Sequence, residues 1–510
     1  MTHDKIILLE ADIVGGQEMR RQRRTRLALG LGLAGIVLLD GCALPRRPRE
    51  RFARADIEAT ATRYRPEEGR PSVAEELRAT KAELETRTVA RARPPRPPLP
   101  QLSPSSGLAD LMHYALLNNP GVEAAFYDWK AAVEAITTRR SLPDPMLQFN
   151  AEIMRGLQSF TPALMTQPGM MWSDPVKLGL RADAAYEASE QKRAVFEGKM
   201  LATALNVKRA WFQLWTLDEQ LRWAREALKL VDEIERLARE RLAVGKVTQQ
   251  DVLRAQMERD RLRNQIANLA DSRGPIVARL RAALGMAPGE PLPDLKPQLT
   301  PTPPDFTEQS LLDTAFARNP RLKAARSEVL EAIALFHLAH RSTVPNYGFG
   351  LGAKIPQGPM GPPSTAWMPS VSFSLPIWRD KVAAEIATGR AKLDAARAML
   401  SAEELDLAVR FAEVAFMWRE ADRNVALYGD RLLPKARAAL NSARAGYVTG
   451  VSTFLDLLEA ERTLLDIQTE HSAALGQRET VLAEMSLVIL GLWPEGIPEI
   501  LSADEKGTTP

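Results

Sequence analysis

One arrangement of motifs occurs twice along this chain of 510 residues. Residues 117–120 (Leu-Asn-Asn-Pro) return 200 positions later as 317–320 (Ala-Arg-Asn-Pro). Residues 245–251, which begin with Gly and end with Asp, return 205 positions later as 450–456. A period of this length is too long for a solenoid, whose repeats run to roughly 50 residues. The sequence therefore predicts a duplication of a whole half-protein.

Proline positions divide each copy into helices and a hairpin. Of the 36 prolines, none falls in 176–274, 377–433 or 435–493. Because proline breaks helix interiors, these stretches predict helices and the proline-rich stretches predict turns, strands or linkers. In the first copy we expect helices 108–118, 121–141, 179–243 and 247–284 and a hairpin at 143–175. In the second we expect helices 308–318, 321–342, 379–446 and 451–490 and a hairpin at 345–377.

The long helix of the first copy carries two apolar stripes. One contains Leu221, Ala224, Leu228 and Val231, and the other contains Leu230, Ile234 and Leu237. One stripe suits a helix that covers a core, whereas two suit a helix held between neighbours on both sides. The two shorter helices on either side of it together match its length, which suggests that they stack end to end. Pro275 and Pro434 lie inside predicted helices and predict kinks.

The hairpin strands alternate between apolar and polar side chains. In residues 147–153, Leu, Phe, Ala and Ile alternate with Gln, Asn and Glu, and residues 347–355 and 370–377 show the same period of two. Segments of about ten residues with this alternation are typical of transmembrane β-barrels. A half-buried sheet of a soluble domain has the same period, so both interpretations stay open. The return strand of the first hairpin is expected at 169–175.

The N-terminus has the features of a targeting signal. Met19 is followed by five arginines up to Arg26 and then by the mostly apolar stretch 27–39, which is too short to span a membrane as a helix. The only cysteine, Cys42, follows this stretch. The arrangement resembles a bacterial lipoprotein signal, in which the cysteine becomes acylated, although an idle thiol is the plainer alternative. We expect residues 1–42 to be the signal, with its true start at Met19.

These features divide the rest of the chain into five parts. An Arg/Pro-rich and mostly extended tether is expected at 43–106, a proline-rich linker at 288–306 and a flexible tail at 493–510. The two copies of the repeated layout occupy 107–287 and 307–492.

Charge and motifs argue against several classes of function. Residues 1–104 carry 20 Lys and Arg against 14 Asp and Glu, but 105–510 carry 47 against 50. A slightly acidic body argues against nucleic acid as a partner, because phosphate binding needs clustered cations. The sequence contains none of the H-E-x-x-H, P-loop or G-x-S-x-G motifs, so we expect neither an enzyme nor a cofactor.

Two weaker signals concern metals. His337 and His340 share a helix face, but no third ligand is evident nearby, so ordinary surface histidines are the preferred interpretation and no metal site is expected. Seven methionines lie in the hairpins, and thioethers suit Cu(I). Methionines in lipid-facing or loop positions are the commoner explanation.

The order and doubled spacing of these features resemble the TolC-like outer-membrane efflux protein family over residues 108–491. The resemblance implies a mainly α fold with a small β part, made of long antiparallel coiled-coil helices and two β-hairpins. It also implies a homotrimeric α-barrel continued by a 12-strand transmembrane β-barrel. Four strands per chain cannot close a membrane barrel, but three chains supply twelve. The implied function is that of the outer-membrane channel of a tripartite efflux or type I secretion system.

The same resemblance implies partners and site residues. A periplasmic adaptor protein and an inner-membrane pump would work with the channel, which would sit in the outer membrane among its lipids. The turns at 244–248 and 446–452 are expected to form periplasmic tips that dock the adaptor, with Gly245, Lys246, Gly450 and Val451 at their ends. The alternative is that Gly245 and Gly450 are simple loop glycines and that the turns bind no partner protein.

A closing gate is the second site that the resemblance implies. Family members carry a tyrosine, an arginine and two acids near the turn before the last helix, and these positions correspond to Tyr447, Ser452, Asp456 and Glu459. Serine at the arginine position predicts a looser or differently fastened gate. Solvated surface charges are the alternative for both acids. For the whole chain, the alternative is a periplasmic coiled-coil adaptor or scaffold without a pore.

Overall fold

The computed structural model describes residues 48–64, 99–153, 157–166, 174–299, 308–356 and 365–497. The chain divides into two compact units, Met1–Arg51 and Phe52–Pro510. Of the first unit, the structure describes only residues 48–51, the beginning of helix α2. Everything below concerns the second unit.

The expected layout is present twice. The first copy contains α4 (Leu108–Asn118), α5 (Pro120–Arg140), β1 (Pro145–Ile153), β2 (Leu157–Thr166), α6 (Pro175–Ala243) and α7 (Gln249–Leu284). The second contains α8 (Glu308–Arg318), α9 (Pro320–His340), the 3₁₀ turn η2 (Arg341–Thr343), β3 (Tyr347–Pro356), β4 (Ala366–Phe373), α10 (Arg379–Ala426), the π-helical turn η3 (Leu427–Leu432), α11 (Leu433–Thr449), α12 (Phe454–Glu484) and the π-helical turn η4 (Met485–Ile489). The prediction of a mainly α fold with a small β part is confirmed.

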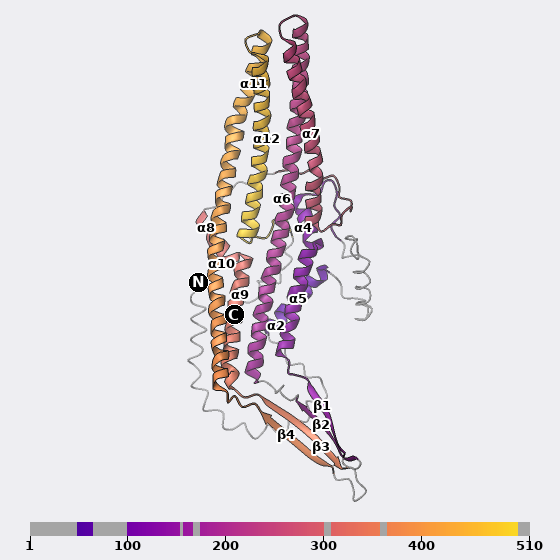
Figure 1. Ribbon diagram of the computed structural model, residues 1–510, viewed down its shortest axis with the longest axis vertical. Helices are drawn as coiled ribbons and strands as arrows, with labels where there is room; N and C mark the ends of the chain where they lie inside the picture. Colours follow the sequence, from indigo (N-terminus) through magenta and orange to yellow (C-terminus); the bar gives the residue numbers. More distant parts are fainter. Residues whose placement is uncertain are drawn as a thin grey trace. The chain divides into compact units, whose positions relative to one another are not determined.

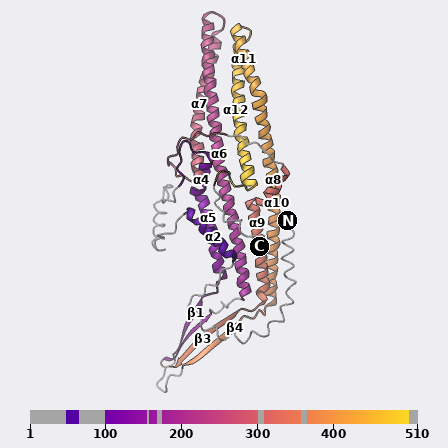
Figure 2. The same ribbon diagram turned by 180° about the vertical axis from the view of Figure 1, so that it is seen from behind.

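Helix α6 lies between neighbours on both sides, as its two apolar stripes predict. It contacts α5 and α7 of its own copy and α9 and α12 of the other copy. Val231 from one stripe and Ile234 from the other are both buried, at 0% and 4% exposure. The long helices run side by side in Figures 1 and 2, with the strands beyond one end and the α6–α7 and α11–α12 turns at the other.

The repeated Asn-Pro step joins two stacked helices in each copy. Asn119 caps α5 by accepting from the N–H of Gly121 (2.8 Å), and its amide donates to the carbonyl of Ala283 near the end of α7 (2.9 Å). Asn319 caps α9 in the same way and donates to Val488 and Ile489 at 3.1 and 3.0 Å. One side chain thus closes the start of one helix and binds the C-terminal turn of another helix far along the chain, which explains why the motif recurs.

The four strands form one antiparallel sheet in the order β1-β2-β3-β4. The expected return strand at 169–175 is wrong where the structure describes it, because Asp174 caps α6 and Pro175 begins that helix. The strand is β2, and its register to β3 passes from Phe160 to Ala163 without pairing the residues between them. Pro162 lies in this gap and has no N–H to donate, which explains why a pattern based on local propensity misses the strand.

Part of the tether, which the sequence predicts to be mostly extended, is helical, as α2 (Pro48–Tyr64). Ala53 and Ile57 are buried in the core cluster formed with α5 and α6. Arg54 donates to Glu134 (2.6 Å) and Asp56 lies 3.4 Å from Arg193. The remaining tether residues up to 98 lie outside the described part of the chain.

The start of the predicted flexible tail is also packed. Trp493 and Ile497 belong to the core cluster around α4, and the Trp493 indole donates to the carbonyl of Ile497 at 3.2 Å. Residues 498–510 lie outside the described part.

The two prolines predicted to kink helices behave differently. Pro275 lies inside α7, which runs through it without interruption. Pro434 follows the π-helical turn η3, where the N–H of Leu433 donates to Tyr428, five residues back. A proline removes one helical N–H and its ring clashes with the carbonyl four residues earlier, so a widened turn before it accommodates the ring.

Candidate functional site

The turn between α6 and α7 forms one exposed tip. Gly245 has a φ of 74°, a left-handed conformation that glycine adopts without strain. The N–H of Gly245 donates to the carbonyl of Leu242 and the N–H of Lys246 to that of Arg241, each at 2.9 Å. These two hydrogen bonds close the end of α6. Both Gly245 and Lys246 are exposed.

The turn between α11 and α12 forms the second tip, at the same end of the helices (Figure 1). Gly450 has a φ of 87°. The N–H of Val451 donates to the carbonyl of Gly446 at 2.8 Å, and the Val451 side chain is 86% exposed. The four residues expected at the tips therefore lie at the two turns.

The aspartate that ends each repeated Gly-to-Asp motif caps a helix. Asp251 accepts from the N–H and the hydroxyl of Thr248 at 3.1 and 2.9 Å. Asp456 accepts from the N–H of Thr453 at 2.8 Å, and its own N–H donates to the Thr453 hydroxyl at 3.2 Å. The hydrogen bonds that its carboxylate accepts from Thr453, above all from the backbone N–H, hold the pKa of Asp456 below its usual value. Glu459, exposed and one turn further along α12, is not part of this cap.

Tyr447 is buried in an apolar cluster to which α6, α7 and α12 also contribute. Its side chain is 2% exposed and meets Phe454 edge to face, with ring centroids 6.0 Å apart. The guanidinium of Arg241, from α6, lies 4.7 Å from the centre of the Tyr447 ring. Burial raises the pKa of Tyr447, against the effect of the nearby Arg241 charge.

Arg241 joins the two tips and is the residue that the sequence patterns miss. It donates to the carbonyl of Tyr447 and, at 2.6 Å, to that of Val448. Under the 205-residue offset, position 241 corresponds to Gly446. The difference between arginine in one copy and glycine in the other is the sequence signal that could have indicated this residue. A Cβ on Gly446 would lie 3.0 Å from the Ser452 Cβ and closer still to its hydroxyl, so the serine packs where a side chain at 446 would stand.

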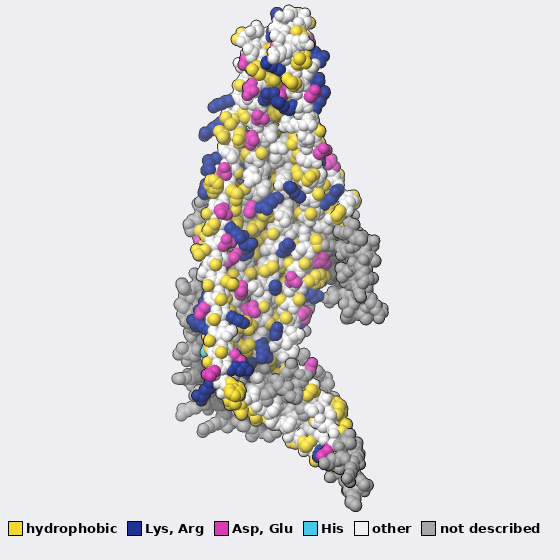
Figure 3. Space-filling model, in the orientation of Figure 1, with side chains coloured by type: hydrophobic (Ala, Val, Ile, Leu, Met, Phe, Trp, Pro, Cys, Tyr) yellow, Lys and Arg dark blue, Asp and Glu magenta, His cyan; other side chains and the backbone are white. Residues whose placement is uncertain are grey.

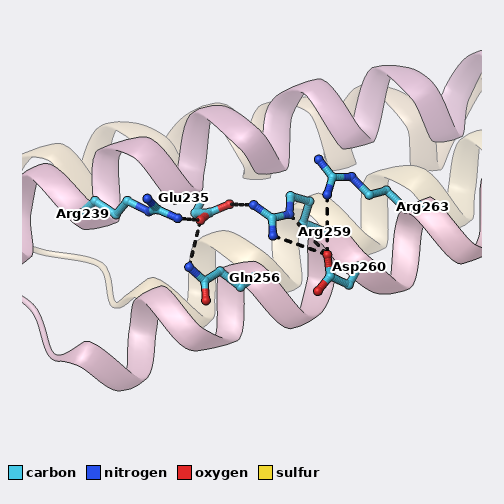
Figure 4. A network of polar contacts seen from close by, with 6 residues as sticks. All are labelled: Glu235, Arg239, Gln256, Arg259, Asp260 and Arg263. Carbon is cyan, nitrogen blue, oxygen red and sulfur yellow. Dashed lines mark hydrogen bonds and ion pairs between the residues drawn. The ribbon is translucent and has the colours of Figure 1, made fainter.

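A buried acid holds α6 and α7 together below the first tip (Figure 4). Glu235 is 4% exposed and accepts from Arg239, from Gln256 at 3.1 Å and from Arg259 at 2.7 Å. Burial alone would raise the pKa of Glu235, but these donors bring it below its usual value. Arg259 also lies 3.4 Å from Asp260. The network ties α6 firmly to α7.

Comparison with known proteins decides the family. Residues 111–286 and 311–489 match the family model described as outer membrane efflux protein, and together they cover more than half of the chain. The chain belongs to the outer membrane efflux protein family.

Relatives and solved structures agree with this assignment. The cobalt-zinc-cadmium resistance protein CzcC of Cupriavidus metallidurans is 22% identical over 364 residues, which are 71% of this chain and 84% of CzcC. The outer membrane protein VceC of Vibrio cholerae has a TM-score of 0.63 at 17% identity, over 75% of this chain and 96% of VceC. The open state of the MtrE outer membrane channel of Neisseria gonorrhoeae has a TM-score of 0.63 at 19% identity, over 76% and 89%.

The protein is accordingly an outer-membrane efflux channel, and the family and its structural neighbours are channel proteins rather than enzymes. Nothing in these findings supports the alternative of a periplasmic adaptor. Among the described residues, no helix is both long and apolar enough to cross a membrane.

The remaining predicted positions add little to this efflux protein's site. The ring of His340 packs against Phe336 at 4.7 Å, and in the described part of the chain no three His, Cys, Asp or Glu side chains form a group that could hold a metal. Of the hairpin methionines, Met146 and Met368 have described side chains, in β1 and β4. Cys42 lies outside the described residues.

Proposed function

We propose that three copies of this chain assemble into one passive exit duct through the outer membrane. The observation that supports this most directly is the four-stranded sheet with large apolar side chains at its surface, partly visible in Figure 3. Phe149 in β1, Leu351 in β3 and Phe373 in β4 are 59%, 50% and 62% exposed. Because four strands are too few to close a membrane barrel, three chains supply the twelve that the barrel needs.

The helices continue this duct as a tunnel into the periplasm. The position of α6 between two pairs of helices is the arrangement of a cylinder wall, in which every helix has neighbours on both sides. The tunnel performs no chemistry of its own. An inner-membrane pump, joined through a periplasmic adaptor, supplies the energy and passes on the substrates of an efflux or type I secretion system.

Assembly is tested by extracting the protein from outer membranes in detergent. A trimer that dissociates only on heating, and that conducts ions in planar bilayers, supports the duct. A soluble periplasmic monomer contradicts it.

The tips are proposed to dock the adaptor. Gly245, Lys246, Gly450 and Val451 are presented at two exposed turns of one end, and the α6–α7 network keeps the first of them rigid. Cysteines introduced at Lys246 and Val451 should crosslink to the adaptor in whole cells. Crosslinking only from a strand position such as Met165 would reverse the proposed orientation.

The same end is proposed to carry the gate. Asp456 and Glu459 from three chains would place six carboxylates around the narrowest point, where they favour cations and repel anions. Tyr447 and Ser452 pack at the turn that holds this ring in place. Since Ser452 replaces the family's arginine, Arg241 is proposed to supply the fastening, through its bonds to the carbonyls of Tyr447 and Val448.

Metal cations are the candidate cargo. The relative CzcC is named for resistance to cobalt, zinc and cadmium, and thioethers such as those of Met146 and Met368 suit soft cations. Deleting the gene should sensitise cells to these ions and leave resistance to organic drugs unchanged. Sensitisation to drugs alone would exclude this cargo.

A further inference from the structure

Glu461, two turns from the start of α12, carries a buried carboxyl group without a hydrogen-bond partner among the described residues. Its side chain is 2% exposed, and neither of its oxygens has a hydrogen-bond donor among the described residues. The side chains around it are apolar: Leu458 and Leu465 on its own helix are buried in clusters with Ile234 and Val231 of α6. It therefore lies where α12 of the second copy packs on α6 of the first.

The charges that act on Glu461 come from two helices. Glu258 of α7 and Asp466 of α12 disfavour its ionisation, and Arg462 favours it. Arg462 is already engaged, since its guanidinium donates to Glu258, which also lies 3.4 Å from Arg261. Burial is the main cause and, with the charges of Glu258 and Asp466 and against that of Arg462, it raises the pKa of Glu461 to about 8.

Charged groups on the other neighbouring elements are occupied elsewhere. On α6, Glu233 pairs with Arg444 of α11 at 3.2 Å, and Glu235 pairs with Arg239 and Arg259. His471 lies further along α12, where its charged neighbours are Asp430 of η3 and Arg437 of α11. Among the described residues, Arg462 is the one cation whose charge acts on Glu461.

We infer that Glu461 is a proton-controlled lock between α12 and the α6–α7 hairpin. With its proton, the side chain is accommodated among the apolar residues of both clusters, and α12 stays packed. Without it, an uncompensated charge faces Glu258 in a dry interface, and the packing of the tip region loosens. Opening of the channel at this end is therefore favoured as the pH rises. This lock rests on the proposed function only for its effect on the channel, because its effect on stability follows from burial alone.

The sign of the linkage is fixed by the raised pKa. In the unfolded chain Glu461 ionises at its ordinary pKa near 4.5, and in the folded chain near 8. Its contribution to stability is complete below the lower value and is lost as the pH rises through the upper one. The loosening of the folded protein depends only on the pKa in the folded state, near 8.

The test compares wild type, E461Q and E470Q in two measurements on the purified detergent-solubilised channel. Glu470 is exposed on the same helix and serves as the control. The Tm of E461Q should exceed that of wild type by an amount that grows from pH 5 to pH 8 and then levels, whereas E470Q should follow wild type. In bilayers, wild type and E470Q should open more above pH 8, and E461Q should not.

A third variant removes the like charge. In E258Q, Arg462 is released toward Glu461, so the pH midpoint of opening should move below 8 and the growth of the Tm difference should end at a lower pH. A constant Tm difference between E461Q and wild type, or an unmoved profile in E258Q, would overturn the lock. Loss of conductance in every protein, with the Tm result intact, would count against the proposed duct and leave the lock standing.

Discussion

At the residue scale, the aspartates of the two tips have the same structural role. Asp251 and Asp456 occupy equivalent positions and cap equivalent helices through Thr248 and Thr453. A carboxylate bound in this way stabilises the start of its helix, whether or not it also faces a pore. Among the gate acids, Glu459 is therefore the cleaner reporter of a charge ring.

Glu459→Gln should lower the preference of the channel for cations while leaving its stability unchanged, because Glu459 takes no part in the cap. Asp456→Asn should lower both, since it weakens the cap as well as the ring. Asp251→Asn is the matched control and should lower stability alone. Reversal potentials in a salt gradient and thermal unfolding measure the two effects. Unchanged selectivity in the Glu459→Gln, Asp456→Asn double variant would place the constriction elsewhere.

Arg241→Ala should loosen the link between the tips. Two charged hydrogen bonds to backbone carbonyls are lost at a half-exposed position, so about 1 kcal/mol is a reasonable cost, or a roughly fivefold rise in the ratio of open to closed channels. Single-channel recording measures this ratio. Arg236→Ala, at an exposed position of the same helix, should leave it unchanged. Equal effects of the two variants would assign the change to charge alone.

At the element scale, the stacked helices depend on how their ends are joined. Each Asn of the repeated Asn-Pro step satisfies an N–H at the start of one helix and a carbonyl at the end of another, and both groups lie in or beside the core. Gly285 completes the first joint with a φ of 72°, and a Cβ there would stand 2.5 Å from the carbonyl oxygen of Asn118. Helices α5 and α7 are thus joined end to end into one column beside the long α6.

Asn319→Ala should destabilise the protein by about 2 kcal/mol, because it removes an N-cap and leaves the carbonyls of Val488 and Ile489 without this donor. Chemical denaturation of the solubilised channel measures the change. Asn268→Ala, at an exposed position inside α7, is the control and should be neutral or slightly stabilising. If both substitutions had a similarly small effect, the hydrogen bonds of Asn319 would not contribute to stability.

At the scale of the whole molecule, one acyl chain and a β-barrel would share the task of anchoring. A single chain gives only marginal membrane binding, so the barrel should dominate. Cys42→Ser should abolish the incorporation of radiolabelled palmitate and leave heat-modifiable trimers in the outer membrane. Continued labelling of the variant would refute lipidation at Cys42, and loss of the trimers would show that the anchor is needed for assembly.

The sequence by itself determined the duplication, the helices and the turns that end them, because these follow from local chemistry. Proline is disfavoured in helix interiors, with Pro275 of α7 as an exception, Gly245 and Gly450 permit left-handed helix ends, and Thr-x-x-Asp steps cap the helices that follow. The apolar stripes of α6 likewise predict neighbours on both sides.

Only the tertiary structure decided features that depend on contacts between distant residues. Strand β2 is held by its pairing with β1 and β3 despite Pro162, and α2 is helical where Ala53 and Ile57 are buried against α5 and α6. Arg241 reaches a turn 206 residues away, and Glu461 is raised in pKa by the burial that packing imposes. Pairing, burial and charge across such separations leave no periodic trace in the chain, since their energies arise only when distant segments pack together.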